Sequence, residues 1–384
     1  MSRNMLKWSV GAAVLTLSLA AQAAANGVVV SVAPQKPSLG KSDDVVVQVT
    51  FTNTSGSPQY VLKSHTPFGG MPMTPLFEVT RDGSPVRYLG AIAKRPAPTA
   101  ADYYLLKPGA SYSAKVELSS LYDMATTGDY AIRFRAASAQ LFADVSALQG
   151  TGSGALQRAA AGGAVDGKEV GKDVGELQSD VATVWIDGAR PRGSHEVTRT
   201  LAEMQADAMA GTAATASLAY SQCSSSQQST ISQALSAAQT MATNADAYMT
   251  RGTMGTRYTK WFGAVNSSRV STIKSHFAAI KSALASKPIT VNCGCTDTSY
   301  AYVYPTQPYT IYVCRAFWNA PLTGTDSKGG TLVHETSHFN VVAGTDDWAY
   351  GQSAAASLAI SNPARAIDNA DSHEYFSENT PALQ

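Results

Sequence analysis

The residues of this chain best suited to chemistry are His334, Glu335 and His338, which form the sequence His-Glu-Thr-Ser-His. On a helix, two histidines four residues apart lie on the same face, where both imidazoles can bind one zinc ion. Glu335 directly follows the first histidine, so its carboxylate can take a proton from water at that ion. The pattern therefore predicts a zinc site that hydrolyses a bond, on a helix that follows Gly329 and Gly330.

A catalytic zinc ion needs a third protein ligand and an open position for water. A metzincin would have Gly and His at fixed steps after His338, and both are absent. Residues 344–351 instead read Gly-Thr-Asp-Asp-Trp-Ala-Tyr-Gly, with Gly344 as a stop for the preceding helix. This run resembles the Gly-Thr-x-Asp-x-x-Tyr-Gly signature of the aspzincins, the deuterolysin family of zinc endopeptidases. The resemblance implies that Asp347 is the third zinc ligand and that Tyr350 assists at the oxyanion.

Asp347 and Tyr350 are three residues apart, so they would share one face if this run is a helical turn. We expect a helix from about residue 348 to 361. The competing interpretation is a chance His-Glu-x-x-His pattern on a structural helix, because this short pattern gives false positives. The second motif, just beyond the first, argues against chance.

The four cysteines, Cys223, Cys293, Cys295 and Cys314, all lie in the second half of the chain. An even number in an exported chain predicts two disulfides rather than a cysteine-based zinc site. Cys293 and Cys295 are too close to pair comfortably, which leaves two of the three possible pairings. We favour Cys223–Cys293 with Cys295–Cys314, which would close one long loop and one short hairpin.

The resemblance extends over residues 220–378 and is strongest to the peptidyl-Lys metalloendopeptidases among the aspzincins. The cysteine spacing matches the two disulfides of that family, which supports the favoured pairing. The matching stretches are residues 223–226, 257–258, 261–263, 301–305, 316–318, 324–326 and 369–376.

In the last of these stretches, the resemblance implies that Asp371 and Glu374 line the pocket for the residue after the cleaved bond. Their spacing of three would place both carboxylates on one helical face, where they could bind one lysine ammonium. The alternative is that they cap a helix or face water, as Asp and Glu usually do.

The chain organisation predicts an exported protein with two folded parts. Residues 1–25 have the basic, apolar and small-residue regions of a signal peptide.

Residues 26–188 contain short β-rich runs at 28–32, 45–51, 76–79, 86–89, 111–118, 130–134 and 181–186, which predict an all-β immunoglobulin-like sandwich. Residues 145–175 are rich in Gly and Ala and are expected to form a flexible insertion. His65 is expected at the surface or in a turn rather than as a metal ligand. The resemblance implies that this sandwich is a removable prodomain; a permanent binding module is the alternative.

Residues 189–219 are expected to connect the sandwich to a catalytic domain at 220–384, with a helix at 197–209. In that domain, apolar residues recur every three or four positions from Ile231 to Tyr248 and from Val270 to Leu284, which predicts two amphipathic helices. Residues 300–314 are expected to form an antiparallel strand pair, and a strand near a protease site can pair with an extended substrate. The fold class is therefore α+β: a mainly helical, zincin-like catalytic domain preceded by the β-sandwich prodomain.

Composition narrows the possible partners. The formal net charge is +1, which gives no electrostatic case for nucleic-acid binding. The apolar run of the signal peptide is too short to span a membrane, and no later stretch is longer. We expect a monomer that binds one Zn²⁺ and acts on proteins or peptides with lysine after the scissile bond.

The sequence thus predicts a secreted zinc endopeptidase that cleaves on the amino side of lysine and is made as a zymogen. Self-cleavage beside Lys168 or Lys172 would release the prodomain. One alternative is a deuterolysin-like protease without strict lysine preference. Another is a non-enzymatic exported protein with a zinc-stabilised binding domain, against which Glu335 argues, because a structural zinc site needs no general base.

Overall fold

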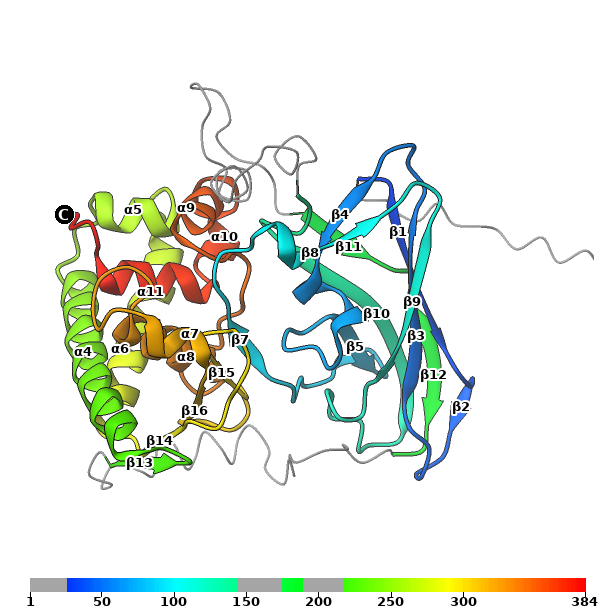
Figure 1. The fold of residues 1–384 in the computed structure, drawn as a ribbon, viewed down its shortest axis with the longest axis horizontal. Coiled ribbons are helices and arrows are strands. Elements are labelled where there is room, and N and C mark those ends of the chain that lie inside the picture. The colour runs from blue at the N-terminus through cyan, green and yellow to red at the C-terminus, as the bar shows by residue number, and fades with distance from the viewer. Residues whose placement is uncertain (1–25, 144–174, 189–216) are drawn as a thin grey trace, which may run out of the picture.

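The computed structural model describes residues 26–143, 175–188 and 217–384. It is a mixed α and β structure, with the strand-rich part before residue 188 and all eight described α-helices after residue 224 (Figure 1). The expected signal peptide, most of the expected Gly/Ala-rich insertion and the helix expected at 197–209 lie outside the described residues. None of the helices in the described ranges is both long and apolar enough to cross a membrane.

We call residues 26–143 and 175–188 the N-terminal region; they form two main sheets. The first has the order β1-β3-β9, and the second has the order β2-β12-β10-β5-β6, with β11 also paired to β10. The strands are β1 (Val28–Pro34), β2 (Ser38–Leu39), β3 (Val46–Asn53), β5 (Phe77–Arg81), β6 (Ser84–Pro85), β9 (Ser111–Glu117), β10 (Gly128–Ser138), β11 (Gly175–Gln178) and β12 (Ala182–Ile186).

Alternating apolar residues on these strands form one core between the sheets. Val47, Val49 and Phe51 of β3 are fully buried, as period-two alternation requires for one face of a strand. The ring of Phe51 meets that of Phe134 from the second sheet at 5.2 Å between centroids, edge to face.

One expectation for the N-terminal region is wrong. Residues 86–89 are not a strand; β6 ends before them, and a single bridge joins Tyr88 to Tyr122. His65 lies in a turn, as expected, between the paired strands β4 (Gln59–Leu62) and β8 (Tyr103–Leu106), and it is 1% exposed. Its turn faces the C-terminal part of the chain instead of water, and Asp346 and Asp347 line the same small cavity.

Residues 217–384, which we call the C-terminal region, pack helices around a second core. The long helix begins at Ser224, whose side chain accepts a hydrogen bond from Gln227 N while Gln227 bonds back, a capping box. The helices are α4 (Ser225–Thr250), α5 (Thr256–Phe262), α6 (Ser267–Ser286), α7 (Arg315–Asn319), α8 (Lys328–His338), α9 (Gln352–Ser361), α10 (Pro363–Ala366) and α11 (Ala370–Glu378). The two amphipathic helices expected from periodicity correspond to α4 and α6.

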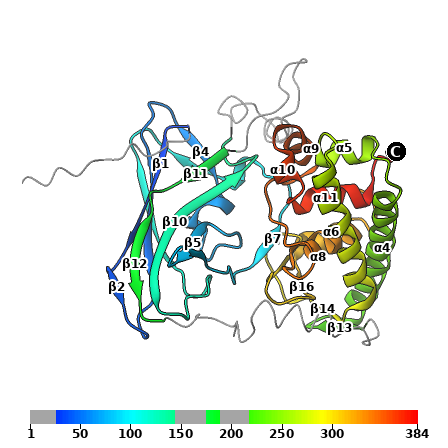
Figure 2. The same ribbon diagram turned by 180° about the vertical axis from the view of Figure 1, so that it is seen from behind.

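A five-stranded sheet joins the two regions. Its order is β13 (Leu218–Ser221), β14 (Ile289–Asn292), β16 (Thr310–Val313), β15 (Ala301–Val303) and β7 (Ile92–Lys94). The strands β15 and β16 are antiparallel, as expected for residues 300–314. Its edge strand β7 comes from the N-terminal region and pairs antiparallel with β15 (Figures 1 and 2).

The two favoured disulfides are present. Cys223–Cys293 joins the residue before the Ser224 cap of α4 to the residue after β14, and Cys295–Cys314 joins the following loop to the residue after β16. Both therefore fix the end of the sheet relative to the helices.

The helix containing the His-Glu-x-x-His pattern differs from the expectation at both ends. Gly329 and Gly330 lie inside α8 instead of before it, and α8 ends at His338, well before Gly344. Residues 347–350 are not helical, and the next helix, α9, starts only at Gln352. Asp347 and Tyr350 therefore do not share a helical face; they lie on a segment without regular secondary structure.

Candidate active site

The helix α8 is enclosed on all sides, and all eleven of its residues are buried. Ser327 caps its start: the Ser327 hydroxyl accepts from Gly330 N at 2.9 Å. A Cβ at Gly329 would lie 3.0 Å from Ala237 Cβ of α4, and one at Gly330 would lie 3.0 Å from Glu374 Cγ of α11. The two glycines therefore let α4 and α11 pack closely against this helix.

Three potential metal ligands converge beyond the last turn of α8. His334 Nε2 and His338 Nε2 are 3.1 Å apart, and Asp347 Oδ1 lies 3.3 Å and 3.6 Å from them. Ligand atoms at about 2.0–2.2 Å from a tetrahedral zinc ion are about 3.3–3.5 Å apart, so this separation fits zinc. Asp347 Oδ1 is buried and has no hydrogen-bond partner in the described structure.

The other nitrogens of both histidines are engaged, which leaves the facing Nε2 atoms free to bind a metal. His338 Nδ1 lies 2.7 Å from the Thr345 carbonyl oxygen, to which it donates as an N–H. His334 Nδ1 lies 2.9 Å from Asp371 Oδ1. Partners of this kind fix the tautomer and ring orientation of metal-binding histidines.

Glu335 faces the same space from the adjacent position of α8 and is fully buried. Burial raises the pKa of its carboxyl to about 8. Its Oε1 accepts a weak hydrogen bond from the backbone N–H of Lys94 at 3.4 Å, and Oε2 has no partner among the described residues. The carboxylate is therefore beside the metal ligands and beside the backbone of β7.

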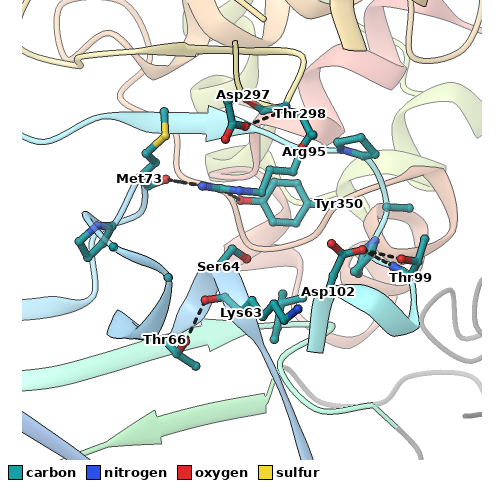
Figure 3. Close-up of a pocket in the computed structure, with 18 of the residues that line it drawn as sticks. Lys63, Ser64, Thr66, Met73, Arg95, Thr99, Asp102, Asp297, Thr298 and Tyr350 are labelled. Atoms are coloured by element: carbon teal, nitrogen blue, oxygen red, sulfur yellow. Dashed lines mark hydrogen bonds between the residues drawn. The ribbon is translucent and has the colours of Figure 1, made fainter. Parts of the chain in front are cut away.

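Tyr350 lies next to the metal ligands and is held by the N-terminal region. Its hydroxyl is 3.3 Å from Asp347 Oδ2 and accepts from Arg95 Nη1 at 3.3 Å. Gln140 bonds its backbone on both sides: Tyr350 N donates to Gln140 Oε1, and Gln140 Nε2 donates to Tyr350 O. Figure 3 shows Arg95 and Tyr350 together on the wall of a cavity of about 590 Å³ between the two regions.

Asp371 and Glu374 lie on α11, on the same side, as their spacing predicts, and both are fully buried. They do not face water; they face the ammonium of Lys94, which lies 2.7 Å from Glu374 Oε2 and 3.5 Å from Asp371 Oδ1. Asp326 contributes a third carboxylate at 3.3 Å. Burial alone would lower the pKa of Lys94, but these three negative charges outweigh it and raise that pKa well above its usual value.

Four residues at this site were not foreseen from the sequence: Lys94, Arg95, Gln140 and Asp326. Asp326 lies in a stretch that matches the peptidyl-Lys enzymes, but no chemistry was assigned to it. The other three belong to the N-terminal region, where no constellation was expected. The one signal for Lys94 is that a lysine in the expected prodomain would suit the lysine pocket expected from Asp371 and Glu374.

Comparisons with known proteins agree with this geometry. The family model of the aspzincins, described as lysine-specific metallo-endopeptidases, matches residues 247–378. An extracellular protease of Aeromonas hydrophila is 43% identical over 345 residues, which is 89% of this chain and 90% of that protein. This similarity includes both the N-terminal and the C-terminal region.

Other relatives match the C-terminal region alone. A peptidyl-Lys metalloendopeptidase of Pleurotus ostreatus is 54% identical over 163 residues, which is 42% of this chain and 96% of that protein. A solved zinc peptidase from Grifola frondosa is 49% identical, covers 42% of this chain and 100% of its own, and has a TM-score of 0.41.

Proposed function

The chain belongs to the aspzincin family of zinc metalloendopeptidases, and from this premise we propose that it cleaves peptide bonds on the amino side of lysine. The observation that carries this proposal is the buried carboxylate pair of Asp371 and Glu374, with a lysine ammonium 2.7 Å from Glu374. The peptidyl-Lys names of relatives that are similar over the C-terminal region give independent support.

In the proposed mechanism, His334, His338 and Asp347 would hold one zinc ion. When bound there, the ion would supply Lewis-acid chemistry that activates water and polarises a carbonyl. Glu335 accepts the proton of the attacking water and returns it to the nitrogen of the leaving amine, which is the backbone nitrogen of the lysine. Tyr350 donates its hydroxyl proton in a hydrogen bond to the developing oxyanion.

The pocket discriminates by charge. A lysine side chain would bring one ammonium to both carboxylates and form charge-assisted hydrogen bonds with them. An apolar side chain of similar length would leave both carboxylates buried and unpaired, which is costly. Arginine carries the same charge, but its planar, longer head group differs in shape from an ammonium.

The wider proposal is a secreted enzyme made as a zymogen. The N-terminal region would be an immunoglobulin-like sandwich that serves as a removable prodomain, and the active protein would be a monomer. The extracellular protease of Aeromonas hydrophila, similar over most of the chain, supports export. Lys168 and Lys172, the proposed self-cleavage positions, lie outside the described residues.

The experiment is digestion of an unstructured protein by purified, processed enzyme, with every cut mapped by mass spectrometry, with and without a chelator. We expect chelator-sensitive cuts whose new N-terminus is lysine. Chelator-sensitive cuts scattered among apolar residues would support a metalloprotease but reject the lysine pocket. They would instead indicate a deuterolysin-like enzyme without strict lysine preference. Absence of cuts by zinc-loaded enzyme would reject the hydrolytic assignment.

A further inference from the structure

We propose that Asn369 is a positioning residue of the active site. Its side-chain amide holds the backbone between Asp347 and Tyr350, and so directs the Asp347 carboxylate towards the two histidines of α8. This inference rests on the zinc site of the proposed function, because Asp347 is a ligand there, but it does not depend on the preference for lysine. It adds the residue that keeps the third ligand in place.

The side chain of Asn369 binds two consecutive backbone groups. Asn369 is fully buried, and its Oδ1 accepts from Trp348 N at 2.9 Å and from Ala349 N at 3.0 Å. Two N–H donors on one side require the amide oxygen to lie there, with the amide nitrogen on the other side. That nitrogen donates to Ser372 Oγ at 3.0 Å, so turning the amide over would break all three bonds. The two peptide groups that follow Asp347 are therefore fixed in orientation.

Asn369 directly precedes α11, where an asparagine side chain ordinarily caps its own helix. Its backbone is extended, as is usual for a cap, but its side chain makes no capping hydrogen bond to α11. Asn266 before α6 and Asn362 before α10 do cap their helices, and each accepts from the backbone N–H three residues later at 3.1 Å. The amide of Asn369 thus binds the segment after Asp347 instead of its own helix.

The backbone before Asp347 is bound to the same short stretch. Asp346 N donates to Asp368 O at 2.8 Å, and Asp346 O accepts from Ala370 N at 3.0 Å, which together form a parallel bridge. These two partners flank Asn369 in the sequence. The start of α11 therefore binds the backbone on both sides of Asp347.

The third ligand needs such support more than the histidines do. His334 and His338 are placed by α8 itself, whereas Asp347 lies on a segment without regular secondary structure. Ligand distances in metal sites vary by only about 0.2 Å, so a segment that shifts weakens the site. Asp371, in the first turn of α11, also lies 2.9 Å from His334 Nδ1. The start of one helix thus positions Asp347 through Asn369 and His334 through Asp371.

The test compares zinc affinity in the full chain with Glu335→Ala, which prevents self-digestion and keeps the proposed ligands. Asn369→Leu has a similar branched shape but no acceptor, so Trp348 N and Ala349 N lose their partner. We expect it to bind zinc about 10- to 100-fold more weakly in competition with a chromogenic chelator, the usual range for lost partners around metal ligands. Asn369→Asp keeps an acceptor oxygen of the same reach and should retain the affinity of the parent chain.

Hydrogen exchange measures the same contact without zinc. In the metal-free chain, the amides of Trp348 and Ala349 should exchange about tenfold faster or more in Asn369→Leu, because their hydrogen bonds are lost. They should stay protected in Asn369→Asp. Asn266→Leu, which removes the cap of α6, is the matched control and should change neither zinc affinity nor the exchange of these two amides.

A second variant guards against misfolding of a leucine at this buried position. Serine is also a good helix cap, so Asn369→Ser can cap α11 while its shorter side chain leaves the segment unbound. Urea unfolding establishes that each chain is folded. Parent zinc affinity in folded Asn369→Leu or Asn369→Ser chains would overturn the positioning role, and so would an equal loss of affinity in Asn369→Asp and Asn369→Leu.

His338→Ala separates this inference from the proposed function. If His338→Ala and Asn369→Leu both lose zinc affinity and Asn369→Asp does not, the zinc site and the role of Asn369 are both supported. If His338→Ala loses zinc but Asn369→Leu does not, only the role of Asn369 fails. If His338→Ala binds zinc as tightly as the parent chain, the proposed zinc site fails, and the inference about its third ligand fails as well.

Discussion

Asp371 contacts two groups that belong to different steps of the proposed reaction. Its Oδ1 lies 2.9 Å from His334 Nδ1 and 3.5 Å from the Lys94 ammonium. Glu374 Oε2 is the nearer partner of the ammonium, at 2.7 Å, and the more distant partner of His334, at 3.3 Å. Asp371 is therefore mainly a partner of His334, and Glu374 is mainly a partner of the Lys94 ammonium.

We predict that Asp371→Asn and Glu374→Gln have separable effects. Both should weaken the preference for lysine, but Asp371→Asn should also lower zinc affinity about 10- to 100-fold, the usual effect of losing a partner of a metal-binding histidine. Competition with a chromogenic chelator measures the zinc affinity of each variant. The ratio of kcat/KM for lysine and methionine substrates measures its preference for lysine. Equal zinc affinity in the two variants would contradict this division.

We predict that Glu335→Ala reduces kcat about 10²- to 10⁴-fold, because it removes the general base and acid while leaving His334, His338 and Asp347 intact. Zinc content, measured by atomic absorption after dialysis, should stay at the wild-type level. His338→Ala is the comparison and should lose zinc as well as activity. Hydrolysis at the wild-type rate by Glu335→Ala would reject its role.

A pair of histidines outside the proposed catalytic groups makes stability depend on pH. His373 Nδ1 lies 2.9 Å from Asn369 O, and His373 Nε2 lies 3.0 Å from His276 Nδ1, which donates to it. Burial lowers the pKa of His276 to about 4, and burial together with His276 lowers that of His373 well below its usual value. Both rings are therefore neutral in the folded protein.

We predict that the contribution of this histidine pair to the free energy of unfolding decreases as the pH falls from about 6.5 towards 4. In this window the unfolded histidines, with a pKa of about 6.5, bind protons and the folded ones do not, so acid favours unfolding. Above about 6.5 the contribution is complete. Urea unfolding at pH 8 and pH 5 measures it, and His276→Gln should show a smaller decrease. The same decrease in both proteins would exclude this pair as its source.

At the scale of elements, α11 carries the carboxylate pair and packs its other side into the core. The ring of Phe376 is fully buried, stacks on Phe277 of α6 at 4.9 Å, and lies 4.5 Å from the Arg257 guanidinium. Arg257 also donates to the Phe376 carbonyl oxygen. These contacts fix the position of α11, and therefore of the pocket.

We predict that Phe376→Ala lowers the free energy of unfolding by about 3–5 kcal/mol, through lost burial and an unfilled cavity. Ile360→Ala on α9 is the control: Ile360 is 60% exposed, so its loss should change stability by less than about 0.5 kcal/mol. Urea unfolding at fixed zinc, in the Glu335→Ala background to prevent self-digestion, compares them. Equal losses would mean that α11 does not depend on this core contact.

The helices could be predicted from sequence because their signals are local. The apolar periodicity of α4 and α6, the Ser224 cap and the four-residue spacing of the histidines all act within one or two turns. Residues 347–350 were expected to be helical, but hydrogen bonds to residues far away in the sequence determine their backbone conformation. Trp348 N and Ala349 N both donate to Asn369 Oδ1, and Tyr350 N donates to Gln140.

The contacts of Lys94 at the site could not be predicted for a related reason. Lys94 and Glu335 are 241 positions apart, and no local pattern marks a three-residue strand that completes a sheet of another region. A lysine on a short β-rich run is ordinarily exposed. Only the folded structure, which places Asp326, Asp371 and Glu374 around its ammonium, shows that Lys94 is buried.

For the whole molecule, zinc should contribute to stability as well as to catalysis, because its ligands come from α8 and from the segment after it. We predict that a chelator lowers the thermal midpoint of the full Glu335→Ala chain, and that added zinc restores it. Zinc at about 1,000 times its dissociation constant stabilises by about 4 kcal/mol. His338→Ala should show no such shift; a wild-type shift in that variant would place the stabilising zinc elsewhere.

The pairing of β7 with β15 also has a consequence for which lysines the proposed protease could attack. A peptide that replaces β7 must offer backbone N–H and C=O groups to β15 over several residues. In a helix those groups are already bonded within the segment, and in a rigid turn they point in divergent directions. We therefore expect target proteins to be cut first at lysines in unstructured linkers and termini, and helical lysines to be spared until the target unfolds.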